Sequence, residues 1–219
     1  MTYDFTPTST REMMFSEPHM RSLLEGITSG RTRFPLNGKS GILLYGSYGT
    51  GKTTYAKILI EEYERRFGGN AKDLFCRNIV CESGARVDSL INTLRNSIEL
   101  ISFNQSGKHY IILDEVNNYK LDKQEQLKGL LNSNNTIFVM TTNYLNKVDK
   151  GLRSRSIVVE MNPATDVKKY VKRIKEMLRA RNVIPLSDSI LEEIVEDSER
   201  DWREICLTLN HIYSTAKSA

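Results

Sequence analysis

Short apolar runs rich in isoleucine, valine and leucine alternate with longer segments of helical periodicity through most of the chain. Strands that are buried on both faces have nearly continuous apolar runs, and their alternation with helices is typical of a parallel sheet covered on both sides. Because crossovers between parallel strands are right-handed, the pattern predicts an open, doubly wound α/β layer with a five-stranded parallel sheet. The predicted strands are residues 41–45, 75–81, 109–114, 136–142 and 156–161, and the predicted helices are 52–67, 86–102 and 123–132.

The strand pattern stops near residue 162, and the rest of the chain has apolar positions at helical spacing. This part predicts three amphipathic helices, with Asp166, Ser187 and Asp201 as residues that can cap their amino ends. We therefore predict two domains: an α/β domain over residues 1–162 and a small helical domain over residues 163–219.

Composition adds little to this fold. The 219 residues carry a net charge of +4, a weak preference for polyanions that does not by itself indicate nucleic-acid binding. No apolar run approaches the roughly 18 to 20 residues of a membrane span, and the first residues lack the pattern of a signal peptide. Cys76, Cys81 and Cys206 are odd in number and have no zinc-ligand spacing, so reduced thiols and a cytoplasmic location are expected.

The clearest motif is GSYGTGKTT, which follows one predicted strand and opens the next helix. It matches G-x-x-x-x-G-K-[ST], a loop whose backbone N–H groups surround nucleotide phosphates. Lys52 would reach the β and γ phosphates, and Thr53 would help to hold Mg²⁺, which makes ATP and Mg²⁺ the expected cofactors. The alternative is a glycine-rich turn before a core helix. The predicted phosphate-binding residues are Gly46, Ser47, Tyr48, Gly49, Thr50, Gly51, Lys52, Thr53 and Thr54.

Three polar residues follow two other predicted strands. Asp114 and Glu115 end the apolar run HYIILD, and Asn143 ends TIFVMTT. Side chains at the carboxyl ends of parallel strands face the ligand crevice, so Asp114 could order Mg²⁺ and Glu115 could polarise an attacking water. Asn143 could orient the same water. The alternatives are a polar loop beginning at the acidic pair and an asparagine that caps a turn. A water-activating glutamate favours ATP hydrolysis over a nucleoside kinase reaction.

Two arginines precede the last predicted strand, in KGLRSRSIVVE. Arginine is permanently charged and fork-shaped, which suits it to binding phosphate. The sequence leaves open whether Arg153 or Arg155 binds a phosphate of its own chain, a phosphate held by a neighbouring copy, or none.

Together these motifs resemble an AAA+ ATPase, and more narrowly the clamp-loader (replication factor C) branch, over roughly residues 7 to 215. Ser154-Arg155-Ser156 lies where the small subunits of that branch have an S-R-C motif, and DWREICLTLNHI matches a D-x-R pattern at the start of the last lid helix. The resemblance implies that Arg155 acts in trans on a neighbour's ATP and that Arg203 acts in cis from the lid. Arg153 is the rival to Arg155. It also implies a homo- or hetero-oligomer with ATP at its subunit interfaces.

Two features depart from this family. Ser47-Tyr48 stands where the family has two prolines, and the chain stops after the lid, where clamp-loader subunits continue into a helical collar. The second departure leaves the stoichiometry open, because the collar holds the family's pentamer together. The chain is either a piece of a longer protein or a relative that assembles through its ATPase domains alone.

By the same resemblance, helix N-termini after the second and third strands would follow a DNA backbone, which makes Arg86, Lys120 and Lys123 candidate phosphate contacts. Scattered surface cations are the alternative. The segment CESGARVDS lacks the aromatic residue of a polypeptide-threading loop, so threading is disfavoured.

Near the start of the chain, the family packs an apolar segment over adenine, and the candidates here are Met13, Met14 and Phe15. An apolar cluster beneath a loop is the other interpretation. Trp202 is expected to anchor the core of the lid.

The leading hypothesis is a clamp-loader-type ATPase that oligomerises and loads or remodels a protein on DNA, with a sliding clamp or a helicase as partner and no membrane. A second hypothesis is a helicase loader or a transposition-type regulator that coats DNA. A third, of another class, is a nucleotide-gated assembly module in which hydrolysis is incidental.

Overall fold

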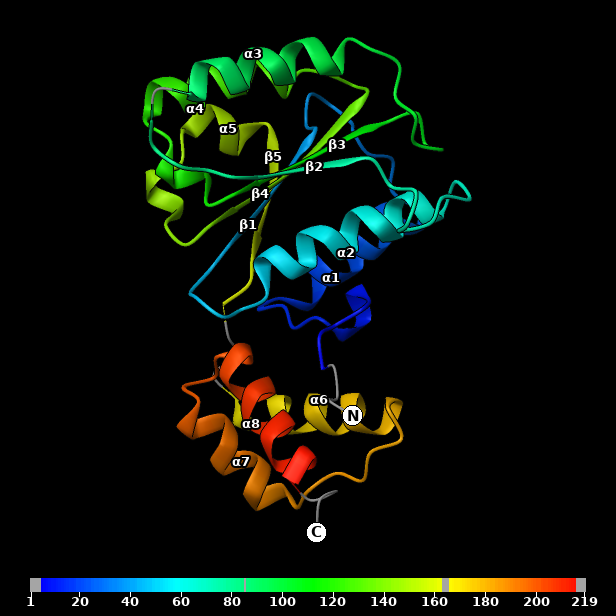
Figure 1. Ribbon diagram of the computed structural model, residues 1–219, viewed down its shortest axis with the longest axis vertical. Coiled ribbons are helices and arrows are strands. Elements are labelled where there is room, and N and C mark those ends of the chain that lie inside the picture. The colour runs from blue at the N-terminus through cyan, green and yellow to red at the C-terminus, as the bar shows by residue number, and fades with distance from the viewer. Residues whose placement is uncertain (1–4, 85, 163–165, 216–219) are drawn as a thin grey trace.

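The computed structural model describes residues 5–84, 86–162 and 166–215. Its centre is a five-stranded parallel sheet with the strand order β2-β3-β4-β1-β5 (Figure 1). The sheet confirms the predicted fold class, and each strand lies within one residue of its predicted bounds. The strands are β1 Gly41–Tyr45, β2 Cys76–Val80, β3 His109–Asp114, β4 Thr136–Thr142 and β5 Ser156–Glu160.

Helices cover both faces of the sheet, as a parallel sheet requires. The helices of the α/β layer are α1 Pro18–Ser29, α2 Lys52–Arg65, α3 Val87–Ile98, α4 Leu121–Leu130 and α5 Lys150–Ser154. Three differ at their ends from the prediction: α2 is two residues shorter, α3 ends at Ile98 instead of 102, and α4 lies two residues earlier. Helices α1 and α5 were not predicted.

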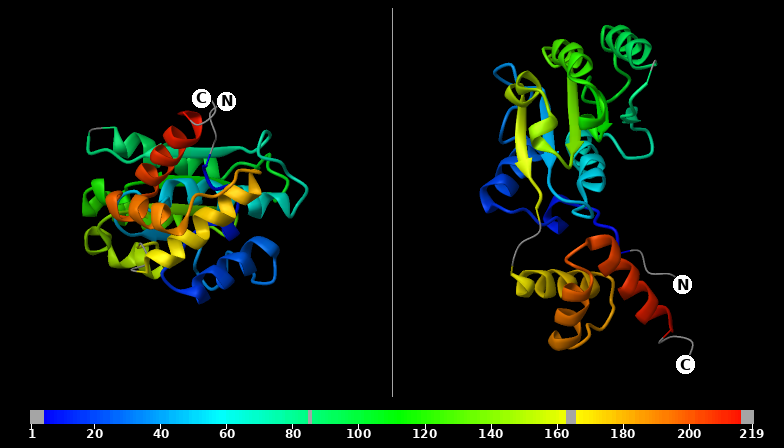
Figure 2. Two further views of the ribbon diagram at one scale, coloured as in Figure 1. Left: turned by 90° about the horizontal axis from the view of Figure 1, so that it is seen from below. Right: turned by 90° about the vertical axis from the view of Figure 1, so that its left-hand side faces the viewer.

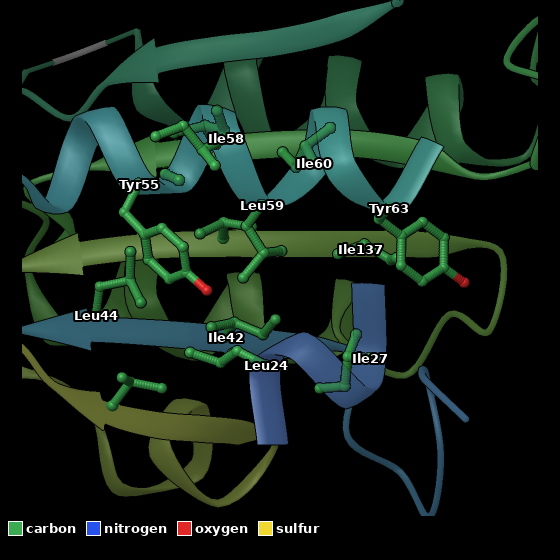
Figure 3. Close-up of a cluster of buried hydrophobic side chains, with 14 of the residues drawn as sticks. Leu24, Ile27, Ile42, Leu44, Tyr55, Ile58, Leu59, Ile60, Tyr63 and Ile137 are labelled. Carbon is green, nitrogen blue, oxygen red and sulfur yellow. The ribbon is translucent and has the colours of Figure 1, made fainter. Parts of the chain in front are cut away.

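Two apolar cores, one on each face, hold these layers together. Leu24 and Ile27 of α1 and Leu59 of α2 pack on Ile42 of β1 and Ile137 of β4, and all five are almost fully buried (Figure 3). On the other face, helices α3, α4 and α5 bury their apolar residues against β1, β3 and β4. Each fully buried aliphatic side chain of this kind stabilises a fold by about 1.5 to 3 kcal/mol. The sheet is therefore a rigid platform for the side chains at its ends.

The helical domain has three helices, as predicted: α6 Val167–Ala180, α7 Asp188–Asp197 and α8 Trp202–Thr215. Two of the predicted caps form, because Asp166 accepts from the Lys168 N–H and Asp201 accepts from the Arg203 N–H. Ser187 precedes α7 but makes no capping hydrogen bond. The domain has its own apolar core, and the predicted boundary at 162/163 falls beside residues outside the described part.

The helical domain lies beyond the end of the sheet at which β1 ends. The N-terminal segment runs between the sheet and the helical domain (Figures 1 and 2). Phe5 is buried in the core of the helical domain, whereas Met13 is buried in the core of the α/β layer. The Thr10 hydroxyl donates to Glu62 of α2, which fixes the segment to the sheet side. Residues 5–13 therefore connect the two domains on one side of the crevice.

Candidate functional site

The glycine-rich loop lies between β1 and α2 and contacts the helical domain directly. Gly49 and Gly51 have φ values of 71° and 81°, a left-handed backbone that glycine adopts without strain. A Cβ added at Gly49 would lie 2.0 Å from the carboxylate of Asp201, so no side chain fits there. The Trp202 N–H also donates to the Gly49 carbonyl at 3.2 Å. The start of α8 is thus packed onto the loop.

Lys52 is buried inside the loop. Its Nζ donates to the carbonyls of Gly46 at 3.0 Å and Ser47 at 2.5 Å. Asn162, which follows β5, accepts from the Ser47 N–H at 3.0 Å and so supports the loop from a distant part of the sequence. These contacts aim the ammonium group at the inside of the loop, where phosphate oxygens would lie.

Burial and, second to it, the positive charge of Arg203 lower the pKa of Lys52 to about 8, against the opposing effect of Asp114 and Glu115. Arg203, at the start of α8, lines the same cavity as Lys52. Arg203 forms no ion pair with Glu199 or Glu204, all three being described residues.

Asp114 lies at the carboxyl end of β3, between two threonines. Its Oδ1 accepts from the hydroxyl of Thr53 at 2.8 Å and from that of Thr141 at 2.5 Å. The two residues predicted for the metal, Thr53 and Asp114, are therefore in direct contact. Thr141 was missed by sequence reasoning, because only its position on the neighbouring strand β4 brings it to Asp114.

Glu115 has a left-handed backbone, with φ 59° and ψ 50°, which is strained for a residue with a side chain. Its N–H donates to Thr141 Oγ1 at 2.9 Å, and the Asn118 side chain donates to its carboxylate at 3.1 Å. With this conformation the chain turns away from the direction of β3 at Glu115, directly after Asp114. Both carboxylates consequently line the same cavity.

Asn143, at the end of β4, lines that cavity too, and its Oδ1 is buried without a hydrogen-bond partner in the described part of the chain. The following turn is capped instead by the Thr142 hydroxyl, which accepts from the Tyr144 N–H at 3.0 Å. A buried acceptor without a partner carries a cost of about 1 to 3 kcal/mol, which a bound water or ligand can remove. The turn-capping interpretation of Asn143 is therefore not what the structure has.

The cavity, about 270 Å³ in volume, is lined by the loop and the two carboxylates, here called its polar end, and by residues of the N-terminal segment and the helical domain that include several apolar ones, here called its apolar end. Met13 and Met14 line its apolar end, but Phe15 does not. Its ring packs edge-on against Tyr55, with centroids 5.2 Å apart, so Phe15 follows the alternative of an apolar cluster. The ring of Trp202 stacks on that of Tyr170 in the lid core, with centroids 5.3 Å apart, as expected.

Seven residues of the predicted phosphate loop line the cavity: Tyr48, Gly49, Thr50, Gly51, Lys52, Thr53 and Thr54. Gly46 and Ser47 contribute to the site through their carbonyls, which accept hydrogen bonds from Lys52.

Arg153 and Arg155 lie at the other end of the sheet. They belong to α5 and its C-cap, directly before β5, and Gly41 at the start of β1 pairs with Ser156. The loop follows the far end of β1, so a strand of five residues, about 16 Å long, separates the arginines from it. Arg155 Nε donates to Asn132 at 2.9 Å. Neither arginine lines the cavity of its own chain.

The three candidate DNA contacts differ in their surroundings. Arg86 and Lys120 are exposed at the N-caps of α3 and α4. Lys123 forms an ion pair with Asp88 at 2.5 Å and lies 3.5 Å from Asp122, so its charge is partly neutralised. The structure therefore favours the first two over the third.

The donor set at the polar end suits Mg²⁺ bound with a nucleotide. Thr53 and Asp114 offer oxygen atoms, which Mg²⁺ prefers, and the ion takes its remaining ligands from phosphates and water. No group of three or more His, Cys, Asp or Glu side chains able to hold a metal occurs among the described residues. A metal here would thus depend on the phosphates.

No helix within the described ranges is long and apolar enough to cross a membrane.

A parallel sheet with a phosphate loop after one strand, an acidic pair after a second, and a helical lid over the crevice defines a P-loop ATPase of the AAA type. The chain belongs to the ATPase family associated with various cellular activities (AAA), whose family model matches residues 42–163.

Among curated proteins, it is 27% identical over 219 residues to replication factor C small subunit 2 of Pyrobaculum islandicum, covering 97% of this chain and 63% of the relative. It is 27% identical over 179 residues to the replication factor C small subunit of Thermoplasma volcanium, covering 80% of this chain and 54% of the relative. The chain thus spans between about half and two thirds of the length of these relatives. The solved structure of C. elegans PCH-2 shares the fold, with a TM-score of 0.60 and 18% identity over 93% of this chain and 64% of that one.

Proposed function

We propose that this chain is a clamp-loader-type ATPase subunit that binds ATP with Mg²⁺, assembles so that ATP lies at subunit interfaces, and uses hydrolysis to load or remodel a protein on DNA. One observation carries the proposal. The cavity joins a phosphate loop, two carboxylates, an unsatisfied asparagine and a lid arginine, while Arg153 and Arg155 lie at the opposite end of the sheet. The similarity to replication factor C small subunits supports the branch.

Within one chain, each polar group has a separate proposed task. Lys52 binds the β and γ phosphates, and Thr53 and Asp114 hold Mg²⁺, which neutralises phosphate charge when bound. Glu115 is the general base that takes a proton from water. Asn143, whose Oδ1 has no protein partner among the described residues, accepts a hydrogen bond from that water and orients it.

The lid and the neighbouring subunit supply the remaining charges. Arg203 contacts the phosphates in cis, which agrees with its effect on Lys52. Arg155 cannot reach its own cavity across the length of β5, so its phosphate belongs to a neighbouring copy. A head-to-tail interface between copies brings the amino end of one sheet to the crevice of the next. An arginine supplied in this way is worth about 10³ to 10⁵ in rate.

The partner surface is proposed at a patch of exposed apolar side chains, here called the apolar patch: Phe75, Leu100, Ile101 and Phe103. Their exposed fractions are 64%, 67%, 88% and 81%, an unusual concentration for a protein surface. The rings of Phe75 and Phe103 are in contact, with centroids 5.9 Å apart.

A sliding clamp is the occupant that the position of the apolar patch favours. Helix α3 begins beside Arg86, a candidate DNA contact, and its 12 residues end just before Leu100, about 18 Å away. The patch also lies away from the lid and the nucleotide cavity, beside the starts of β2 and β3. A protein bound there would leave the crevice open and would lie near DNA held at the helix N-termini.

The test is the ATPase rate per subunit against protein concentration, with and without primed DNA, for wild type and Arg155→Ala. We expect the wild-type rate to rise with concentration and with DNA, and the variant to stay at a low, concentration-independent rate. Arg65→Ala, on an exposed part of α2, is the matched control and should behave as wild type. A wild-type rate independent of concentration and equal to that of Arg155→Ala would refute the shared site.

A further inference from the structure

The apolar end of the cavity holds two charged side chains that the proposed phosphate chemistry does not use. Glu12 comes from the N-terminal segment and Arg173 from α6 of the lid, and both line the cavity beside Met14 and Met177. Their side chains are only 18% and 12% exposed. Placing a carboxylate and a guanidinium in such a site is costly unless their hydrogen-bonding capacity is used.

The contacts of Arg173 leave one nitrogen unused. Its Nη1 donates to Glu176 at 3.4 Å, whereas its Nη2 is buried and has no hydrogen-bond partner among the described residues. The distance from Nη2 to Glu12 Oε2 is 3.8 Å, well beyond the roughly 2.7 to 2.9 Å of a charge-assisted hydrogen bond. The two groups therefore attract each other without satisfying the N–H donor.

Glu12 is held in place independently of Arg173. The Thr8 N–H donates to its Oε2 at 2.8 Å, and the Met13 carbonyl beside it accepts from Arg21 at 2.6 Å. The N-terminal segment thus presents an oriented carboxylate, and the lid presents an oriented donor, side by side at the same end of one cavity. Such a pair can contact a ligand that offers a donor next to an acceptor.

Adenine offers that combination. It carries an amino group beside a ring nitrogen that accepts a hydrogen bond, whereas guanine carries a carbonyl oxygen in place of the amino group. We infer that Glu12 and Arg173 read the nucleobase, with the carboxylate accepting from the amino group and the guanidinium donating to the ring nitrogen. Guanine would place its carbonyl oxygen against the carboxylate, so the pair selects adenine. This inference rests on the proposed nucleotide site.

The test is calorimetric binding of the non-hydrolysable analogues AMPPNP and GMPPNP, and of tripolyphosphate, which lacks a base. We expect wild type to prefer AMPPNP by at least about tenfold, because a lost hydrogen bond to a charged group costs about 1.5 to 3 kcal/mol. Glu12→Gln should reduce that preference to about threefold or less, since an amide can also donate to a carbonyl oxygen. The amide keeps the shape of the side chain and can still accept from Thr8.

Arg173→Met should weaken AMPPNP about tenfold or more and leave tripolyphosphate unchanged, while Lys172→Met, an exposed change on the same helix, should alter neither. A preference unchanged in Glu12→Gln, or equal wild-type affinities for both analogues, would overturn the base-reading role. Equal weakening of AMPPNP and tripolyphosphate in Arg173→Met would overturn it as well, by making Arg173 a phosphate or lid contact. Wild type that binds none of the three ligands would instead refute the proposed function.

Discussion

The two ends of the parallel sheet carry different chemistry. At the carboxyl ends of β1, β3 and β4, Lys52, Asp114 and Asn143 line one cavity under a lid. At the amino ends, α5 and its C-cap carry Arg153 and Arg155, and neither of them lines that cavity. The candidate phosphate-binding groups of one chain are thus gathered at one end of the sheet, and two further arginines lie at the other.

The proposed function assigns this difference to a second subunit. A side chain cannot span the roughly 16 Å of β5, so a conformational change within one domain does not bring Arg155 to its own phosphates. An oligomer does so simply, because the amino end of one sheet can face the carboxyl end of the next. The position of the two arginines therefore bears on the quaternary structure of the protein.

At the carboxyl end, a large effect on turnover is expected from Glu115→Gln. Losing a general base should lower the ATPase rate about 10²- to 10⁴-fold, while ATP binding is kept because the phosphate contacts are unchanged. Single-turnover hydrolysis and ATP affinity measured on the same samples would separate the two. Glu193→Gln, an exposed acid on α7, serves as the control. Near-normal turnover in Glu115→Gln would show that another group activates the water.

A smaller effect is expected far from the cavity, in the double variant Ile101→Ser and Phe103→Ser. Losing two exposed apolar contacts should weaken binding of a sliding clamp about thirtyfold, a cost of roughly 2 kcal/mol, and leave the DNA-free ATPase rate unchanged. Leu207→Ser removes another exposed apolar side chain, from the lid, and should have no effect. Unaltered clamp binding would assign the apolar patch to a different partner.

The smallest effect is on pH dependence. With a pKa of about 8, Lys52 loses its proton as pH rises through 8, so ATP affinity should fall about tenfold between pH 7 and 9. Arg203→Gln removes a positive charge that lowers this pKa, so the midpoint should move to higher pH. Because the unfolded chain binds more protons than the folded one between pH 8 and 10.5, Lys52 should make the free protein more stable as pH rises there. A midpoint unmoved by Arg203→Gln would place that arginine away from the loop.

Local sequence predicted the strands and the phosphate loop well, because buried parallel strands leave continuous apolar runs and the loop has a fixed spacing. It failed for α1, which begins at Pro18 after Glu17 without a side-chain cap, and for α5, whose five residues are too few to show a period. The boundaries of α3 were too wide because apolar residues continue past Ile98 into the exposed Leu100 and Ile101. Those residues form a surface instead of a helix face.

The missed parts of the site depend on contacts between residues far apart in the chain. Thr141 reaches Asp114 only because β3 and β4 are neighbours, and Asn162 reaches Ser47 across 115 positions. Glu12 and Arg173 meet because the lid folds back over the N-terminal segment. No local spacing encodes these pairs, so a single sequence could indicate the phosphate end of the cavity but not the base end.

The most direct test of the central claim is complementation between two inactive variants. Lys52→Ala subunits lack a working phosphate site but keep Arg155, and Arg155→Ala subunits have the reverse defect. If the site is shared, an equimolar mixture should recover about a quarter of the wild-type rate, the fraction of randomly formed head-to-tail interfaces that combine the two intact halves. Sedimentation would verify that mixed assemblies form. A mixture that assembles but hydrolyses ATP no faster than the sum of its separate components would contradict the account.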